Sequence, residues 1–385
     1  MKTFCKINNN KTNVLYAFLI VWVIEGGEIM FDTESQKEKA VIVKVVLDKR
    51  ENVAETMAEL KALVKAAGAD VVGELTQNAE KPDGKFEIGT GKLQELKELV
   101  ASSNATMVVF DNGLTGSKIT NLENELNVRV IDRTMLILDI FATRALSNEG
   151  KLQVELAQLK YTLPRLNALS GSSGRYGSGG IGMRGPGETK IEINRRVVEK
   201  RIFEKEKQLK KLKEERDLRR QKRNQSHKPL VALVGYTNSG KSTLLNTLTK
   251  ANVLAKDMLF ATLDTTTREL WLGLNKEIMV VDTVGFVSNL PHELVDAFSS
   301  TLEETLYANL LVNVVDISNP HHEEQEKVVF DVLKDLGVKD TPIIMVYNKI
   351  DKVENLQKQP DKIYISAKQN IGFEELKQKI VEILF

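Results

Sequence analysis

The sequence predicts an α/β protein in which a domain with a mostly parallel sheet follows a small α/β domain and a long helical hairpin. Short apolar runs typical of buried parallel strands alternate with amphipathic helical patterns in both α/β parts. A glycine-rich turn directly follows one such run, Leu230 to Val234. Two apolar stripes with helical spacing lie between the α/β parts, and consecutive helices of this kind usually pack antiparallel.

The glycine-rich turn has the form of a phosphate-binding loop. GYTNSGKS, at positions 235–242, fits G-x-x-x-x-G-K-[ST]. Gly235 and Gly240 let the backbone aim its N–H groups at phosphate oxygens, and the helix that begins near Lys241 adds its positive end. We expect Lys241 to reach the β- and γ-phosphates and the Ser242 hydroxyl to bind Mg²⁺. The alternative is a glycine turn that begins a helix and binds no phosphate. The remaining loop residues expected at the nucleotide are Tyr236, Thr237, Asn238 and Ser239.

A second strand signal, Glu277 to Val281, ends in the sequence DTVG. An Asp at the end of such a strand can hold the water shell of Mg²⁺, which gives Asp282 this predicted role. The Gly285 amide can then face the γ-phosphate. Thr283 and Val284 complete the expected contact segment.

Two later strand ends carry residues suited to guanine. Asp351, in NKID, can accept hydrogen bonds from the N1–H and the exocyclic amine of guanine, whereas adenine offers the opposite pattern. Asn348 and Lys349 precede it, and the Lys349 stem can cover the base. The backbone of Ser366, Ala367 and Lys368 suits the guanine oxygen. Since ligands of open α/β sheets bind at the carboxyl edge of the strands, these motifs should converge. The set resembles the translation-factor-like class of GTPases.

Composition limits the alternatives. The chain has 385 residues, enough for two or three domains, and its 42% apolar and 28% charged content is typical of soluble globular proteins. The net charge of +1 means that any nucleic-acid surface must be local. A single cysteine, Cys5, excludes a disulfide framework and a zinc cluster, and favours a reducing cytoplasm.

Residues 1–39 form an N-terminal extension. Its apolar run, Val14 to Ile24, is too short to span a bilayer and resembles a signal-peptide core, but no small-residue cleavage site follows. The codons for Glu25-Gly26-Gly27 can form a purine-rich ribosome-binding sequence just before Met30. We therefore expect translation to start at Met30, or the extension to be disordered. No stable membrane insertion is expected, and peripheral membrane association is left open.

The pattern divides the rest of the chain into three parts. An α/β domain is expected at 40–140, with strands at 40–47, 70–76, 107–110 and 128–132 and helices at 53–67, 93–100 and 121–126. A helical hairpin follows at 141–227; its first helix is expected to end at Pro164 and its second near Asn224. The nucleotide-binding domain occupies 228–385.

The hairpin carries the candidate RNA contacts. Its connection, SGSSGRYGSGGIGMRGPG at 170–187, is unusually long and glycine-rich. Arg175, Arg184 and Tyr176 are residue types that bind phosphate backbone and stack on bases; the alternative is a flexible linker. The basic end of the second helix could bind RNA phosphate or serve only as a hinge. Its cations are Arg216, Arg219, Arg220, Lys222 and Arg223.

Longer motifs resemble one family. GGIGMRGPGETKIE at 179–192, LFATLDTTTR at 259–268 and DTVGFVSNLPHELVDAFSSTLEET at 282–305 are similar to the HflX family of ribosome-associated GTPases, over about residue 40 to the end. The resemblance implies docking on the 50S subunit and its rRNA, and GTP-dependent splitting of stalled or hibernating 70S ribosomes. It also implies a cytoplasmic protein, which we expect to be a monomer. Some members carry a further C-terminal domain, whereas only residues 369–385 follow SAK here.

The resemblance also assigns individual roles. Thr262 is implied as the switch threonine that binds Mg²⁺ and, with Lys241 and Gly285, serves catalysis. Phe286 stands where many GTPases place a water-orienting Gln, so slow intrinsic hydrolysis that ribosomes stimulate is expected. Asn238 matches the P-loop Asn of potassium-activated GTPases, which makes K⁺ a candidate cofactor beside Mg²⁺ and GTP or GDP. The other switch residues implied at the nucleotide are Phe260, Ala261, Leu263 and Asp264.

Two functions remain open on the sequence. One is a ribosome-splitting GTPase, and the other is an RNA-binding assembly factor for the large subunit whose GTP only gates binding. A metabolic nucleotide enzyme fits less well, because no separate small-molecule catalytic constellation is present. The four histidines show no metal-binding spacing with Cys or with a carboxylate pair.

Overall fold

The computed structural model describes most of the chain after residue 36. The described residues are 37–48, 50–173, 190–224, 228–249, 259–260, 265–273, 276–288, 304–354, 356, 358–360 and 362–385. The predicted start at Met30, most of the glycine-rich connection, and the switch residues Ala261, Thr262, Leu263 and Asp264 lie outside these ranges.

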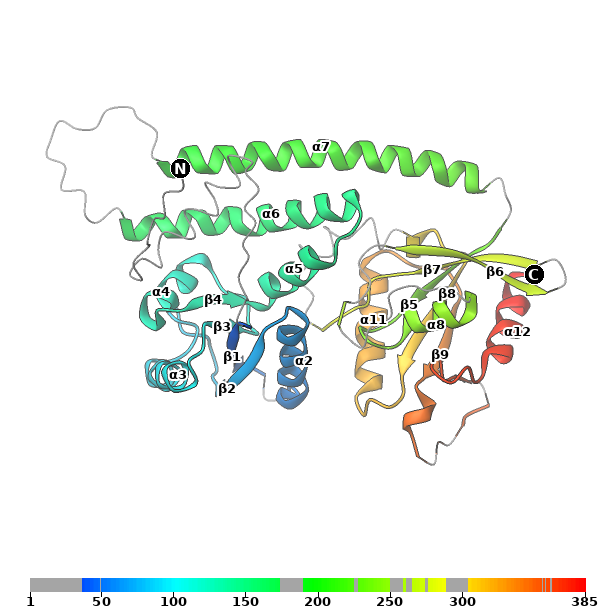
Figure 1. Ribbon diagram of the computed structural model, residues 1–385, viewed down its shortest axis with the longest axis horizontal. Coiled ribbons are helices and arrows are strands. Elements are labelled where there is room, and N and C mark those ends of the chain that lie inside the picture. Colours follow the sequence, from blue (N-terminus) through cyan, green and yellow to red (C-terminus); the bar gives the residue numbers. More distant parts are fainter. Residues whose placement is uncertain are drawn as a thin grey trace, which may run out of the picture. The chain divides into compact units, whose positions relative to one another are not determined.

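The first sheet contains four strands, β1 (Lys39–Val46), β2 (Asp70–Asn78), β3 (Met107–Phe110) and β4 (Arg129–Asp132). All pairings are parallel and the order is β2-β1-β3-β4 (Figure 1). The helices that follow them are α2 (Val53–Ala66), α3 (Thr90–Ser103), α4 (Gly116–Leu126) and α5 (Arg133–Arg144). The predicted alternation of strands and helices is therefore confirmed.

Alternating side chains of the central strand β1 define two apolar layers. Ala40 and Ile42 pack with α2 and α5, whereas Val41 and Val43 pack with α3 and α4. The helices therefore cover both faces, as a parallel sheet requires. The carboxylate of Asp132 caps α5 by accepting a hydrogen bond from the Met135 amide at 3.0 Å.

The hairpin consists of α6 (Asn148–Ser173) and α7 (Lys190–Asn224), which lie side by side in Figure 1. Three ion pairs give their direction: Glu149 with Arg216 at 3.0 Å, Glu155 with Lys205 at 2.7 Å, and Lys160 with Glu206 at 2.7 Å. The pair nearest the start of α6 involves a residue near the end of α7, whereas Glu155 and Lys160, further along α6, pair with residues 11 and 10 positions earlier in α7. The helices are therefore antiparallel, as expected.

The predicted end of the first helix at Pro164 is wrong, because α6 continues to Ser173 and takes in the first residues of the expected loop. Proline in a helix interior costs about 3 kcal/mol, so contacts from outside the helix must offset it. The next residue, Arg165, supplies such contacts. Its guanidinium donates to the Leu114 carbonyl, outside α6, at 2.9 Å, and also to the Tyr161 carbonyl within α6 at 2.7 Å.

The second sheet has the order β10-β9-β8-β5-β7-β6. Five strands are parallel, and β6 (Thr266–Gly273) runs antiparallel to β7 (Lys276–Asp282) at one edge. The other strands are β5 (Leu230–Val234), β8 (Leu310–Asp316), β9 (Ile343–Asn348) and β10 (Ile363–Tyr364). The sequence pattern does not indicate β6, whose mostly exposed or half-buried residues lack an apolar run.

In the part of the chain that the structure describes, three helices cover the second sheet: α8 (Lys241–Thr249), α11 (His322–Asp335) and α12 (Phe373–Leu384). One apolar cluster joins the sheet to α8 and α12, and another joins it to α11. A short 3-10 helix, η2 (Ile350–Lys352), follows β9. Among the described residues, no helix is both long and apolar enough to cross a membrane.

Candidate nucleotide site

The loop between β5 and α8 has a backbone that only glycine fits at two positions. Gly235 has φ +144°, and a Cβ there would lie 2.3 Å from the Val314 carbonyl oxygen. Gly240 has φ +98°, and a Cβ there would lie 2.2 Å from the Asn348 side-chain nitrogen. Both glycines of the motif are thus fixed by close approaches as well as by φ. The loop therefore has one defined backbone conformation, held by contacts with Val314 and Asn348.

Lys241 is held inside this loop. Its buried ammonium donates to the carbonyl of Gly235 at 3.0 Å and to that of Tyr236 at 2.8 Å. Burial lowers the pKa of Lys241 from 10.5 to about 8; Asp282 opposes this shift and Lys349 adds to it. A buried cation with few compensating anions is suited to bind phosphate.

The two residues predicted around the metal lie together. The Ser242 hydroxyl donates to the carboxylate of Asp282 at 2.6 Å, and Asp282 is fully buried. Hydroxyl and carboxylate oxygens are the ligand types that Mg²⁺ prefers. This pair fits the predicted metal position, whose third predicted residue, Thr262, lies outside the described residues.

Gly285 lies directly against the phosphate-binding loop. A Cβ at this position would be 2.8 Å from the Lys241 ammonium and 2.8 Å from the Thr237 Cα. Two residues earlier, the Thr283 hydroxyl donates to the Leu233 carbonyl of β5 at 2.7 Å. The DTVG segment therefore follows the loop closely, as the predicted role of Gly285 requires.

Phe286 faces the core. Its side chain is 1% exposed and packs in the cluster that contains Tyr236, Val281 and Leu311. Its backbone pairs with the loop: its amide donates to the Gly235 carbonyl at 3.1 Å, and its carbonyl accepts from the Thr237 amide at 2.7 Å. A buried phenyl ring cannot orient a water molecule, so this position supplies packing and backbone order.

The residues predicted to read the base meet at the ends of β9 and β10. The Asn348 side chain donates to the Ser239 carbonyl at 2.8 Å and accepts from the Ala367 amide at 2.9 Å. The Asp351 carboxylate accepts from the Ser366 hydroxyl at 2.5 Å. The structure therefore brings together three motifs that are far apart in the chain. Lys368 is exposed beside them.

Lys349 shows a contact that sequence reasoning missed. Its ammonium donates to the Asn238 carbonyl at 2.7 Å and pairs with the Asp316 carboxylate at 2.5 Å. Asp316 ends strand β8, and the available signal was an Asp at the end of an apolar strand, as for Asp282. The pair holds the Lys349 stem across the loop.

Phe260, the one described residue of the predicted switch set, is buried in an apolar cluster with residues of α5.

Three family models match the chain in succession. They are described as GTP-binding GTPase N-terminal, over residues 54–142; GTP-binding GTPase Middle Region, over 144–223; and 50S ribosome-binding GTPase, over 230–349. The first two cover most of the first sheet and the hairpin. The third covers the phosphate-binding loop and extends to Lys349.

The chain is also similar to curated proteins named GTPase HflX. It is 50% identical over 369 residues to that of Caldanaerobacter subterraneus subsp. tengcongensis, covering 96% of this chain and 86% of the relative. It is 40% identical over 363 residues to that of Escherichia coli, covering 92% of this chain and 85% of the relative. A solved structure of SsGBP in complex with GDP is 28% identical, covers 90% of this chain and 98% of its own, and has a TM-score of 0.51.

Proposed function

The chain belongs to the HflX family of GTPases and hydrolyses GTP, and on this premise we propose that it binds the large ribosomal subunit and dissociates stalled or hibernating 70S ribosomes. The match to a domain described as a 50S ribosome-binding GTPase carries the proposal. The matches to these two curated relatives cover more than nine-tenths of the chain, so the support extends to the first sheet and the hairpin.

The nucleotide is assigned to the site at the carboxyl edge of the second sheet. Lys241 and the loop amides bind the phosphates, Ser242 and Thr262 bind Mg²⁺, and the Gly285 amide contacts the γ-phosphate. When bound, Mg²⁺ neutralises charge on the β- and γ-phosphates. Guanine is read by Asp351, covered by Lys349 and contacted by the backbone of 366–368. The hydrogen bonds from Asn348 to Ser239 and from Ala367 to Asn348 support this assignment, because they join the phosphate end of the site to the base end.

Intrinsic hydrolysis is slow in this proposal, and the ribosome accelerates it. The buried position of Phe286 supports a slow intrinsic rate, since its side chain points into the core and does not reach the attacking water. Potassium is proposed as a second cofactor at Asn238. This residue has φ +61°, which presents it at the turn of the loop.

Ribosome docking is assigned to the parts that precede the nucleotide-binding domain at 228–385. These are the α/β domain at 40–140 and the hairpin at 141–227, whose glycine-rich connection and basic second helix contact rRNA. The hairpin is suited to reach into a large RNA surface, because α7 spans 35 residues, about 50 Å at 1.5 Å per residue. We further propose a cytoplasmic monomer, with peripheral membrane association left open.

The test is GTP hydrolysis in potassium buffer with and without purified 70S ribosomes or 50S subunits, with light scattering recorded in the same samples. We expect acceleration by orders of magnitude and a fall in scattering with 70S. Acceleration without loss of 70S would favour the assembly-factor alternative. No change with either particle would contradict both. Lys241→Ala, which lacks the phosphate-binding ammonium, is the control for scattering changes that do not depend on GTP.

A further inference from the structure

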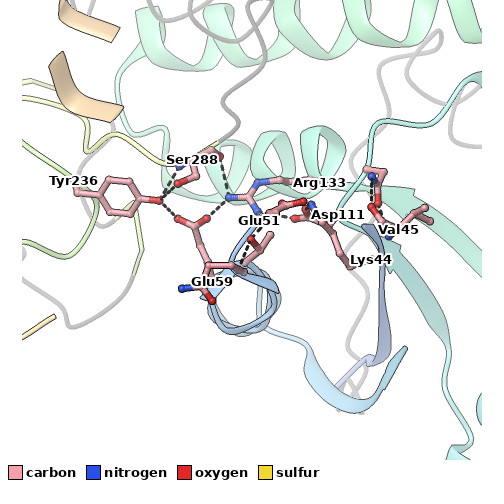
Figure 2. A network of polar contacts seen from close by, with 11 residues as sticks. Lys44, Val45, Glu51, Glu59, Asp111, Arg133, Tyr236 and Ser288 are labelled. Carbon is pink, nitrogen blue, oxygen red and sulfur yellow. Dashed lines mark hydrogen bonds and ion pairs between the residues drawn. The ribbon is translucent and has the colours of Figure 1, made fainter. Parts of the chain in front are cut away.

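A polar network joins the phosphate-binding loop to the first sheet (Figure 2). Tyr236, the second residue of the loop, directs its hydroxyl to the Glu59 carboxylate of α2. The same phenol oxygen accepts from the Ser288 amide at 2.8 Å and lies 2.6 Å from the Ser288 hydroxyl. Burial and the Glu59 carboxylate both raise the pKa of Tyr236, so the phenol stays a hydrogen-bond donor. These contacts lie within the compact unit Glu38–Phe385.

Arg133, the first residue of α5, closes the network. One guanidinium nitrogen donates both to Glu59 at 2.5 Å and to the Ser288 carbonyl at 3.0 Å. The other terminal nitrogen of the guanidinium donates to the Asp111 carboxylate at 2.6 Å. That carboxylate also accepts from the Lys44 ammonium at 2.7 Å. Burial disfavours the charge of Arg133, but Glu59 and Asp111 outweigh it and raise its pKa. The cation is thus fixed on both sides.

Ser288 lies three residues after Gly285, and the segment between them is held along its length. Phe286 is paired by backbone hydrogen bonds to the phosphate-binding loop. Val284 and Val287 are buried in the same apolar cluster as Ile137 and Phe141 of α5. Ser288 is held through its amide by Tyr236 and through its carbonyl by Arg133. Residues of α2 and α5, the helices packed on the first sheet, therefore hold the C-terminal end of this segment in place.

We infer that Glu59 and Arg133 are positioning residues for GTP hydrolysis, which act through Tyr236 and Ser288 to hold the Gly285 amide beside Lys241. The inference rests on the proposed assignment of Gly285 to the γ-phosphate. Neither residue touches the nucleotide. Their effect should therefore fall on the chemical step, which depends on sub-ångström placement, rather than on the affinity for nucleotide, which the loop and the base-reading residues supply.

The decisive variants are Glu59→Gln and Arg133→Lys. Gln keeps an acceptor for Tyr236 but removes the charge that Arg133 binds. Lys has a single terminal nitrogen in place of the two that bind Asp111 on one side and Glu59 and Ser288 on the other. We expect kcat for GTP to fall about ten-fold in each, with the dissociation constant of a fluorescent GDP analogue changed less than about two-fold. Arg129→Lys is the matched control; Arg129 is on β4 and pairs with Asp139 at 3.3 Å.

A double variant separates positioning from general loss of stability. If Glu59 acts through Tyr236, Tyr236→Phe with Glu59→Gln should lower kcat no further than either change alone. Additive losses in kcat, or unchanged or increased kcat in both single variants, would overturn the inference. Tyr236→Phe removes only a hydroxyl and provides the kinetic test should Arg133→Lys fail to fold.

Gly285→Ala tests the underlying assignment independently. Its Cβ would approach the Lys241 ammonium to 2.8 Å, so hydrolysis should be lost. Retained hydrolysis would remove the assignment of Gly285. An inactive Gly285→Ala beside fully active Glu59→Gln and Arg133→Lys would remove only the inference about positioning.

Discussion

Asn348 and Ser239 are joined by a 2.8 Å hydrogen bond from side-chain amide to main-chain carbonyl, although 109 residues separate them. Because the Asn348 oxygen also accepts from the Ala367 amide, one side chain fixes the distance between the phosphate-binding loop and the segment that is proposed to read the base. The geometry of the site depends on this residue before any nucleotide is bound.

Asn348→Ala should therefore weaken GDP and GTP binding together, by ten-fold or more. It leaves a buried carbonyl and a buried amide without their partner, which costs about 1–3 kcal/mol each. Titration with a fluorescent GDP analogue measures the loss. Asn121→Ala is the control, because Asn121 also donates to a carbonyl, that of Lys85, but far along the chain in α4. Equal affinities for the two variants would contradict the bridging role.

Gly240→Ala should abolish nucleotide binding and lower the melting temperature. The substitution demands a φ of +98° from an L residue and places Cβ 2.2 Å from the Asn348 nitrogen. Strain of this kind costs on the order of 1–3 kcal/mol before the clash is counted. Thermal unfolding and GDP titration check both effects. Gly113→Ala meets no atom within 4 Å and should behave as wild type.

GDP affinity should fall as pH rises above about 8, the lowered pKa of Lys241. The phosphates require the protonated amine, so its loss weakens binding. The stability of the protein without nucleotide depends on pH in the opposite direction. Between about 8 and 10.5 the folded chain loses this proton before the unfolded chain does, so the contribution of Lys241 to the free energy of unfolding rises with pH. Titrations from pH 7 to 9.5 measure the affinity, and Lys241→Arg should remove the dependence in this range.

Phe286→Ala should lower the free energy of unfolding by about 3–5 kcal/mol, since the ring is 1% exposed within a packed cluster. Phe286→Gln should also destabilise the protein and give no gain in hydrolysis, because its side chain would start in the core. Denaturant unfolding and single-turnover hydrolysis check these outcomes. Faster hydrolysis by the Gln variant would show that this side chain can reach the attacking water after all.

Hydrolysis should be faster in KCl than in NaCl at equal ionic strength if Asn238 holds a potassium ion. Asn238→Gly is the informative variant, because glycine accepts the φ of +61° and only the side chain is lost. It should remove the difference between the two salts while GDP affinity is kept. Equal rates for the wild type in both salts would refute the potassium site.

The arrangement of the residues in the proposed nucleotide site was largely predictable, because they sit in short motifs at strand ends. Lys241, Ser242 and Asp282 meet where the pattern placed them. Pro164 misled the prediction because contacts of Arg165 with residues outside α6 override a local rule. Strand β6 was missed because its position at the edge of the sheet leaves it without a buried run.

The contacts that no local pattern could reveal are those with large sequence separation. Tyr236 lies 177 residues from Glu59, and Arg133 lies 155 residues from Ser288. Nothing in the sequence around Glu59 distinguishes it from the solvated glutamates of other helices. Only the folded chain shows that its carboxylate faces an arginine and a phenol.

The alignment of α6 on α7 has a consequence for handling the protein. Three ion pairs between partly exposed side chains, Glu149–Arg216, Glu155–Lys205 and Lys160–Glu206, match the two helices. Electrostatic attraction at such positions decays over about 3 Å in 1 M salt, compared with about 10 Å in 0.1 M. Higher ionic strength should therefore weaken these ion pairs and make the hairpin less stiff. High-salt washing of ribosome preparations would loosen the hairpin as well as the RNA contacts proposed for it.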